Sequence, residues 1–296
     1  MGFIEWAAAR ERENCRKIMA KQSPCEFTNT KYIHYYDEGW IHVIYPKDTA
    51  SIKGYIVSIH GGGLIAGCSE QNFNFANFIA KQGYVVFIPE YRLIPEATFT
   101  DQLNDIIKAF NIIGREASNY VTRPIYLIGD SAGCHLALIA NAIGMDPAIE
   151  SAFEVENSHN LTFSGVWLNA PMIETTGFNK IGLFMAKHFY GKKWRKTPKA
   201  KYLKNPELLY PYLPVKTVLL TSTGDDLKKQ AIRAWNDIMD INDVGPAIGF
   251  GLKNHEHDWN VMFPDYDDFT VEMNSWLLNC MVGIKTVRND LGDLND

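Results

Sequence analysis

The sequence predicts an α/β fold in which a mostly parallel sheet carries helices on both faces. Short, nearly continuous apolar segments are typical of strands buried on both sides, and longer segments with helical periodicity alternate with them. Strands that are joined through helices run parallel. The expected strands are Tyr55–Ile59, Tyr84–Ile88, Ile125–Ile128, Gly165–Leu168, Val218–Thr221 and Ile248–Leu252. The expected helices are Glu70–Gln82, Thr100–Glu116, Ala132–Ile143, Leu227–Asn242 and Tyr266–Cys280.

Two segments interrupt this alternation. Residues 1–30 contain an amphipathic helix candidate before the first expected strand. Residues 171–214 separate two strands by more chain than a simple connection needs. We interpret both as elements of a helical cap over the site, and we expect residues 1–296 to form a single domain.

Composition and charge exclude several classes of protein. The 296 residues are 46% hydrophobic and 21% charged, with a formal net charge of −5, whereas a general nucleic-acid binder carries a basic footprint. No apolar run approaches the roughly 20 residues that cross a bilayer, and the charged start of the chain does not resemble a secretory signal. The five cysteines are scattered and odd in number, which favours reduced thiols. We therefore expect a cytoplasmic protein with no nucleic-acid partner and no stable membrane insertion; a homo-oligomer stays open.

The most informative motif is Gly129-Asp130-Ser131-Ala132-Gly133. It lies directly between an expected strand and an expected helix, which is the context that a nucleophile elbow requires. The turn strains the backbone of Ser131, and the two glycines allow the strand and the helix to approach closely. The amides at the start of the helix favour negative charge beside the serine. An ordinary strand–turn–helix is the alternative, and the context favours Ser131 as a nucleophile.

A glycine-rich loop, His60-Gly61-Gly62-Gly63, follows the first expected strand. On its own, a glycine triplet indicates only a flexible turn. In combination with the elbow, it predicts that the backbone N–H groups of Gly62 and Gly63 face a point near Ser131. Together with the N–H of Ala132, they would stabilise the oxyanion of a tetrahedral intermediate.

A serine nucleophile in this context needs an acid and a base, which follow it along the chain in that order. Asp225 and Asp226 come after one expected strand, and His255 and His257 come after the last one. Ligands bind beyond the carboxyl ends of parallel strands, so both pairs lie where the chemistry is expected. An aspartate there can also cap a helix, a role that suits Asp226. The histidines could instead belong to a surface loop or bind a metal, but no third ligand cluster supports one, and we expect no metal.

His135 is a rival base because it lies only four residues after Ser131. It belongs to the helix that leaves the elbow, so its side chain should enter the helix packing. We interpret it as a structural histidine.

Four blocks resemble the hormone-sensitive-lipase-like esterases of the α/β-hydrolase fold. They are His60–Gly63, Gly129–Gly133, Asp225-Asp226-Leu227 where the family has Asp-Pro-Leu, and Tyr91-Arg92-Leu93-Ile94-Pro95-Glu96 where the family has Tyr-Arg-Leu-Ala-Pro-Glu. The resemblance extends from about residue 54 to about residue 280. It implies an α/β-hydrolase fold and an ester hydrolase.

The resemblance also assigns roles to single residues. It implies that Asp225 is the acid of the catalytic triad and that His257 is the base, because His257-Asp258-Trp259 matches the His-x-aromatic ending of the family. Three departures are visible: Cys134 and His135 replace the usual small and Asn residues, and Asp258 replaces the usual Gly. These departures bear on substrate choice more than on the reaction.

These features predict a serine carboxylesterase that hydrolyses small to medium acyl esters through an acyl-enzyme, with a small-molecule ester as its partner and no cofactor. Apolar side chains of the proposed cap could line the site or fix the cap to the core: Trp6, Phe178, Ile181, Leu183, Phe184, Met185, Phe189, Tyr190 and Trp194. A lipase acting on longer-chain esters is one alternative. A non-catalytic ligand-binding protein on the same fold is another, and the complete triad disfavours it. An amide- or peptide-cleaving hydrolase would want a propeller domain or an amine anchor, and this chain has no room for the propeller. The basic stretch from Lys187 to Lys204 could attract anionic lipid, but we interpret it as a solvated face of the cap.

Overall fold

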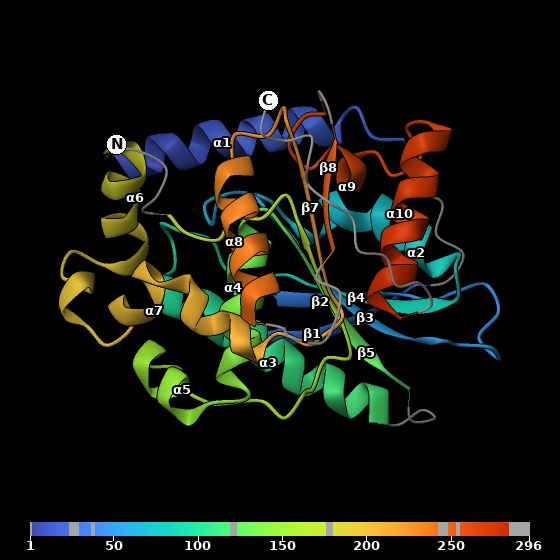
Figure 1. Cartoon of the computed structure of the whole chain (residues 1–296), viewed down its shortest axis with the longest axis horizontal. Coiled ribbons are helices and arrows are strands. Elements are labelled where there is room, and N and C mark those ends of the chain that lie inside the picture. The colour runs from blue at the N-terminus through green and yellow to red at the C-terminus, as the bar shows by residue number, and fades with distance from the viewer. Residues whose placement is uncertain are drawn as a thin grey trace.

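The computed structural model describes residues 2–23, 30–36, 39–118, 123–175, 180–241, 248–252 and 255–283. Within these ranges, an eight-stranded sheet with the order β1-β2-β4-β3-β5-β6-β7-β8 crosses the middle of the molecule (Figure 1). Its strands are β1 (Thr30–Tyr36), β2 (Gly39–Ile44), β3 (Gly54–Ile59), β4 (Tyr84–Pro89), β5 (Ile125–Asp130), β6 (Val166–Asn169), β7 (Thr217–Ser222) and β8 (Ile248–Leu252).

Six of these strands, β3 to β8, pair in parallel and correspond to the six expected strands, with ends that differ by at most two residues. The first two strands were not expected. They form an antiparallel pair, and β2 also pairs antiparallel with β4. Exposed and buried positions are mixed along both, as in a strand pair at the edge of a sheet, so no continuous apolar run marks them. The fold prediction of a mostly parallel sheet is confirmed.

Helices cover both faces of this sheet. One hydrophobic cluster joins the sheet to α3, α4 and α5, and a second joins it to α2, α9 and α10. Figure 1 shows α3, α4 and α8 on one side and α2 and α10 on the other. The bounds are α1 (Phe3–Met19), η1 (Ser69–Asn72), α2 (Phe73–Ala80), α3 (Phe99–Ser118), α4 (Ala132–Ile143), α5 (Pro147–Phe153), α6 (Lys180–Tyr190), η2 (Trp194–Lys196), α7 (Ala200–Lys204), η3 (Pro206–Tyr212), α8 (Lys228–Ile241), α9 (Trp259–Met262) and α10 (Asp268–Met281).

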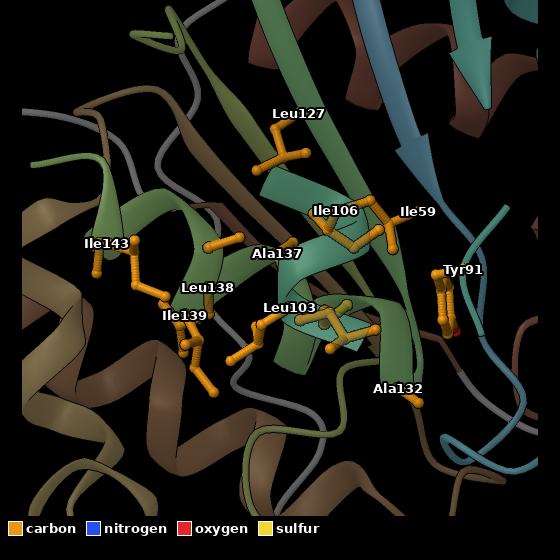
Figure 2. Packing of buried hydrophobic residues seen from close by; sticks show 14 of the residues in the cluster. Ile59, Tyr91, Leu103, Ile106, Leu127, Ala132, Ala137, Leu138, Ile139 and Ile143 are labelled. Carbon is orange, nitrogen blue, oxygen red and sulfur yellow. The ribbon is translucent and has the colours of Figure 1, made fainter. Parts of the chain in front are cut away.

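The packing of α4 fixes the position of the elbow serine. Leu138 of α4 and Leu103 of α3 lie in the same buried cluster as Ile59 and Leu127 of the sheet (Figure 2). Burying such a side chain stabilises the fold by about 1.5–3 kcal/mol. Because all twelve residues of α4 are buried, this helix is held firmly, and its first turn begins directly after Ser131.

Helix α1 lies across the end of the sheet and meets α6 at its start (Figure 1). The rings of Phe3 and Phe184 pack edge to face with centroids 4.9 Å apart. Further along α1, the Arg12 guanidinium donates to the carbonyl of Ile65 and forms a two-point ion pair with Glu96. These contacts tie α1 both to α6 and to the loops after β3 and β4.

The basic stretch lies on α6, η2, α7 and the turns between them, and most of its cations are exposed. The exposed ones are Lys187, Lys192, Lys193, Arg195, Lys196, Lys201 and Lys204. Lys199 is the exception, since it is buried with its ammonium 3.7 Å from the carboxylate of Glu154. In the described part of the chain, no helix combines the length and the apolar character needed to cross a bilayer.

Of the cysteines that the structure describes, Cys15, Cys68 and Cys134 carry free thiols. Cys25 lies outside the described residues. Burial raises the pKa of the Cys134 thiol well above its ordinary value, so this neighbour of the elbow stays neutral.

Candidate active site

The backbone at Ser131 is strained in the way that the motif predicts. Its φ of 50° and ψ of −117° lie in a region that residues other than glycine rarely adopt. A Cβ atom on Gly133 would lie 2.1 Å from the carbonyl oxygen of Ile59, and one on Gly129 would lie 2.7 Å from the backbone nitrogen of Cys134. Only glycine allows this close approach of strand and helix, which presents the Ser131 hydroxyl at the start of α4.

The structure brings the three predicted residues of the triad together. The Oγ atom of Ser131 lies 2.7 Å from Nε2 of His257, and Nδ1 of His257 lies 3.0 Å from Oδ1 of Asp225. The Asp225 carboxylate is buried, whereas the imidazole is partly exposed. In the neutral imidazole that suits this geometry, Nδ1–H donates to Asp225 and Nε2 accepts from Ser131.

Asp225 also makes the turn that follows β7. Its Oδ1 atom accepts a hydrogen bond from the backbone N–H of Leu227 at 2.7 Å. Asp226, to which the sequence suggested a capping role, is exposed, and the side-chain contact observed at this turn comes from Asp225. The same hydrogen bond holds the Asp225 carboxylate in place beneath His257.

The other two histidines lie elsewhere. The ring of His255 stacks on Trp259 with centroids 4.3 Å apart. His135 is buried in the helix packing, where Nδ1–H donates to the carbonyl of Ile173 and Nε2 accepts from the Tyr190 hydroxyl. Burial lowers the pKa of His135 to about 4, so it is neutral at pH 7. Both ring nitrogens of His135 are engaged away from Ser131.

The glycine loop after β3 adopts left-handed backbone conformations at two positions, with φ of 110° at Gly62 and 62° at Gly63. A Cβ atom on Gly62 would lie 2.1 Å from the carbonyl oxygen of Ala66, whereas one on Gly63 would meet nothing closer than 3.9 Å. Within the described residues, no hydrogen bond engages the N–H groups of Gly62, Gly63 or Ala132. These three donors are therefore available to an oxygen atom of a ligand.

Asp130, the residue before Ser131, links the elbow to this loop, a role that was not predicted from the sequence. Its carboxylate accepts from the N–H of Gly61 at 2.8 Å and from Nδ2 of Asn72 at 2.7 Å. The Tyr91 hydroxyl donates to the carbonyl of His60 from the other side. An acidic residue inside the elbow motif is the signal that could have suggested this link.

The different environments of the two glycines give a test of the loop. Gly62→Ala places a methyl group against a backbone carbonyl, so the loop must shift, and we expect kcat to fall by about 10²–10³, the loss typical of an oxyanion donor. Gly63→Ala has space and retains its N–H, so the backbone strain costs only about 1–3 kcal/mol of stability and kcat falls by less than about tenfold. Measurements of kcat and of the melting temperature of both variants test these expectations. Equal kcat losses in two folded variants would contradict the assigned geometry.

A second carboxylate beside His257 was noticed in the sequence only as a departure from the usual glycine. Oδ2 of Asp258 lies 3.2 Å from Nε2 of His257, the nitrogen that also contacts Ser131. Asp258 is buried and its φ is 56°. Burial raises the pKa of Asp258 to about 8, although the charge of His257 acts to lower it. Burial of His257 alone would lower its pKa, but the charges of Asp258 and then Asp225 outweigh this and raise it to about 9.

A metal pair of His255 and His257 was the alternative considered for this loop. The His255 ring packs on Trp259, and the His257 ring lies between Asp225 and Ser131. Over the ranges that the structure describes, no group of three or more His, Cys, Asp or Glu side chains could hold a metal ion.

The family model BD-FAE matches residues 41–209, which is more than half of the chain. The chain belongs to the BD-FAE family. The match contains the glycine loop and the elbow of this BD-FAE protein and ends before Asp225 and His257.

Among curated relatives, the chain is 25% identical over 172 residues to "Probable isoprenylcysteine alpha-carbonyl methylesterase ICMEL1" of Oryza sativa subsp. japonica, covering 57% of this chain and 39% of that protein. It is 33% identical over 99 residues to the versiconal hemiacetal acetate esterase of Dothistroma septosporum, covering 32% of this chain and 30% of the relative. The BD-FAE chain thus spans well under half the length of these relatives.

Solved structures match over nearly the whole chain. Esterase B from Lactobacillus rhamnosis HN001 superposes with a TM-score of 0.81 at 20% identity, covering 95% of this chain and 93% of that one. A second structure of esterase B, described as inhibited by a C4-C4 tributyrin phosphonate, has the same TM-score at 21% identity and covers 95% of this chain and 94% of that one. At this identity the likeness shows the fold alone, and it confirms the α/β-hydrolase fold of this BD-FAE protein.

Proposed function

We propose that the chain is a serine carboxylesterase that works through an acyl-enzyme, with Ser131 as nucleophile, His257 as base and Asp225 as the orienting acid. The observation that carries this proposal is the continuous hydrogen-bond chain from Ser131 through His257 to the buried Asp225. Membership in the BD-FAE family and the esterase names of the relatives support a carboxylic ester as substrate.

In the first half of the reaction, Nε2 of His257 takes the hydroxyl proton of Ser131 while Oγ forms a bond to the ester carbonyl carbon. The carbonyl oxygen becomes an oxyanion, which accepts hydrogen bonds from the free N–H groups of Gly62, Gly63 and Ala132. Collapse of this intermediate breaks the bond to the alcohol, and the imidazolium gives its proton to the departing oxygen. Ser131 then carries the acyl group.

In the second half, His257 takes a proton from a water molecule whose oxygen attacks the acyl carbon. The new oxyanion occupies the same donors, and its collapse releases the carboxylic acid and returns the proton to Ser131. The Asp225 carboxylate holds the imidazole in the tautomer with Nδ1–H and stabilises the imidazolium in both halves.

For the cap, we propose that α1 and residues 171–214 together cover the site within a single domain of residues 1–296. The support is the attachment of α1 to α6 through Phe3 and Phe184, and to the loops after β3 and β4 through Arg12. Among the candidate lining residues, Tyr190 is hydrogen-bonded to His135, and Phe189 and Trp194 are buried. These three side chains therefore fix the cap to the core. Phe178 lies outside the described residues, and so do the side chains of Ile181 and Leu183.

For the substrate, we propose esters with acyl chains of roughly two to six carbons. Each buried methylene contributes about 0.8 kcal/mol until the acyl chain reaches the end of a capped pocket. One structure of esterase B is described as inhibited by a C4-C4 tributyrin phosphonate, which supports this range by analogy of fold. We expect kcat/KM on nitrophenyl esters to peak within this range and to fall by at least tenfold towards palmitoyl.

A lipase is the second candidate, because the exposed cations of α6, η2 and α7 could contact an anionic lipid surface. The acyl series measured with and without anionic vesicles separates the two. Activity that climbs steadily to long chains and rises further on vesicles would show a lipase and overturn the esterase proposal. A ligand-binding protein without catalysis would show no turnover anywhere in the series.

A further inference from the structure

The nitrogen of His257 that faces Ser131 has two oxygen partners. Ser131 Oγ lies at 2.7 Å and Asp258 Oδ2 at 3.2 Å. When Nδ1–H donates to Asp225, the neutral ring presents only a lone pair at Nε2, and an ionised carboxylate also presents only lone pairs. Two acceptors repel at this distance unless a proton lies between them. The contact with Asp258 therefore favours a state in which the pair holds one proton between Nε2 and Oδ2.

The Asp258 carboxylate is held in place by a chain of buried amides. Nδ2 of Asn169 donates to Oδ1 of Asp258 at 2.9 Å, and Oδ1 of Asn169 accepts from Nδ2 of Asn260 at 2.9 Å. Asn260 in turn exchanges hydrogen bonds with Asn274 of α10. All three asparagines are fully buried, so the carboxylate is anchored from behind and stays directed at His257.

The charges around the ring come from several elements. The titratable groups facing or flanking His257 and Asp258 are Asp225, Asp130, Cys134, His255 and Glu256. The Asp130 carboxylate already accepts hydrogen bonds from the N–H of Gly61 and from Nδ2 of Asn72, and the Cys134 thiol is neutral. Glu256 is exposed, where solvent screens its charge. In the described part of the site, Asp258 is thus the carboxylate in direct contact with Nε2.

We propose that Asp258 is a positioning residue that acts through His257, making it a stronger base and at the same time keeping a proton between the two side chains at neutral pH. The inference rests on the proposed role of His257 as the general base. A protonated His257 cannot accept the Ser131 proton, so the competent fraction is lost as the pH falls through the raised pKa of this histidine. We therefore expect the activity of the site to be highest at alkaline pH.

The test compares pH profiles of kcat/KM for the wild type, Asp258→Asn, Asp258→Gly and the control Glu256→Gln. Asn and Gly both tolerate the left-handed φ of 56° at this position, so the backbone can stay as it is. For the wild type we expect an acid limb near pH 9, the pKa to which His257 is raised. In both Asp258 variants, the limb moves down by about one to three pH units, as loss of a contacting charge predicts.

The two profiles should cross. Near pH 6, the Asp258 variants should exceed the wild type by roughly tenfold, because more of their His257 is neutral. Near pH 10 they should fall below it, because a weaker base accelerates proton transfer less. Glu256→Gln removes the charge of an exposed neighbour of His257. The acid limb of its pH profile should move by less than about half a pH unit.

A purely structural Asp258 would give variants whose activity falls by the same factor at every pH, and that outcome overturns the inference. Titration of the His257 ring by NMR, in the wild type and in both variants without substrate, gives a readout that does not need catalysis. An unchanged His257 titration overturns the role of Asp258, even in a protein that hydrolyses no ester. Conversely, a shifted titration in a protein without turnover would reject the esterase proposal and leave the contact intact.

Discussion

Replacing Ser131 with alanine should lower kcat for ester hydrolysis by about 10⁴–10⁶, which is the loss observed when a triad nucleophile is removed. The residual rate would come from the oxyanion donors and from binding alone. The fold should survive, because Ser131 contributes a hydroxyl next to His257 and its replacement leaves the packing of α4 unchanged. Thermal melting should report a stability change within about 1 kcal/mol, the size of one net hydrogen bond.

Labelling provides an independent readout for the same variant. An organophosphate should modify Ser131 of the wild type, located by mass spectrometry of peptides, and should modify nothing in Ser131→Ala. Ser151→Ala is a matched control, since Ser151 is exposed on α5, and this variant should retain full activity and labelling. Turnover above roughly a hundredth of the wild-type rate in a folded Ser131→Ala would reject the nucleophile.

His257→Ala should cost a comparable 10⁴–10⁶ in kcat, because the triad acts as a unit and a serine without its base is a weak nucleophile. The same variant should react slowly with the organophosphate, since that reaction also needs the proton to leave Ser131. Its fold should be retained, because the ring is more than a third exposed (37%) and fills no part of the core.

His255→Ala separates the two histidines of this loop. Its ring packs on Trp259, so truncation should reduce stability by about 1 kcal/mol and kcat by less than about tenfold. A dead His255→Ala beside an active His257→Ala would place the base two residues away from our assignment. Both ring nitrogens of His135 are engaged in hydrogen bonds, so its replacement should lower the melting temperature more than it lowers kcat.

The parts of the fold that the sequence predicts are those with local signals. The bounds of α4 were predicted as observed, because an apolar helical segment begins directly after the elbow and ends at Gly144. The strands β3 to β8 are short apolar runs that glycines, prolines and polar turns separate. In contrast, β1 and β2 form a partly exposed pair at one edge of the sheet, with His34 and His42 among their residues. This pair joins the sheet through β2 and β4, which are distant in the sequence.

The candidate site follows the same rule. Ser131 and the glycine loop carry motifs, and the chain order of α/β-hydrolases directs attention to Asp225 and His257. The contact of Asp258 with His257 carries no such motif. It depends on a left-handed backbone at Asp258 and on Asn169, Asn260 and Asn274, which come from three separate elements. Geometry of that kind arises from tertiary packing, which a single sequence does not display.

The bridge made by Asp130 has a consequence for engineering. Its carboxylate accepts hydrogen bonds from Gly61 in the glycine loop and from Asn72, and it is the neighbour of Ser131 in the elbow. The Ser131 hydroxyl and the backbone amides of the glycine loop are therefore held in one rigid frame. Helix α1 contacts that frame through Arg12, at the carbonyl of Ile65, and α6 contacts it through Tyr190, at His135; both of these residues would stay unchanged in a library. Libraries that randomise the exposed aromatic and basic side chains of those helices should therefore change which esters are accepted while the reacting atoms keep their spacing.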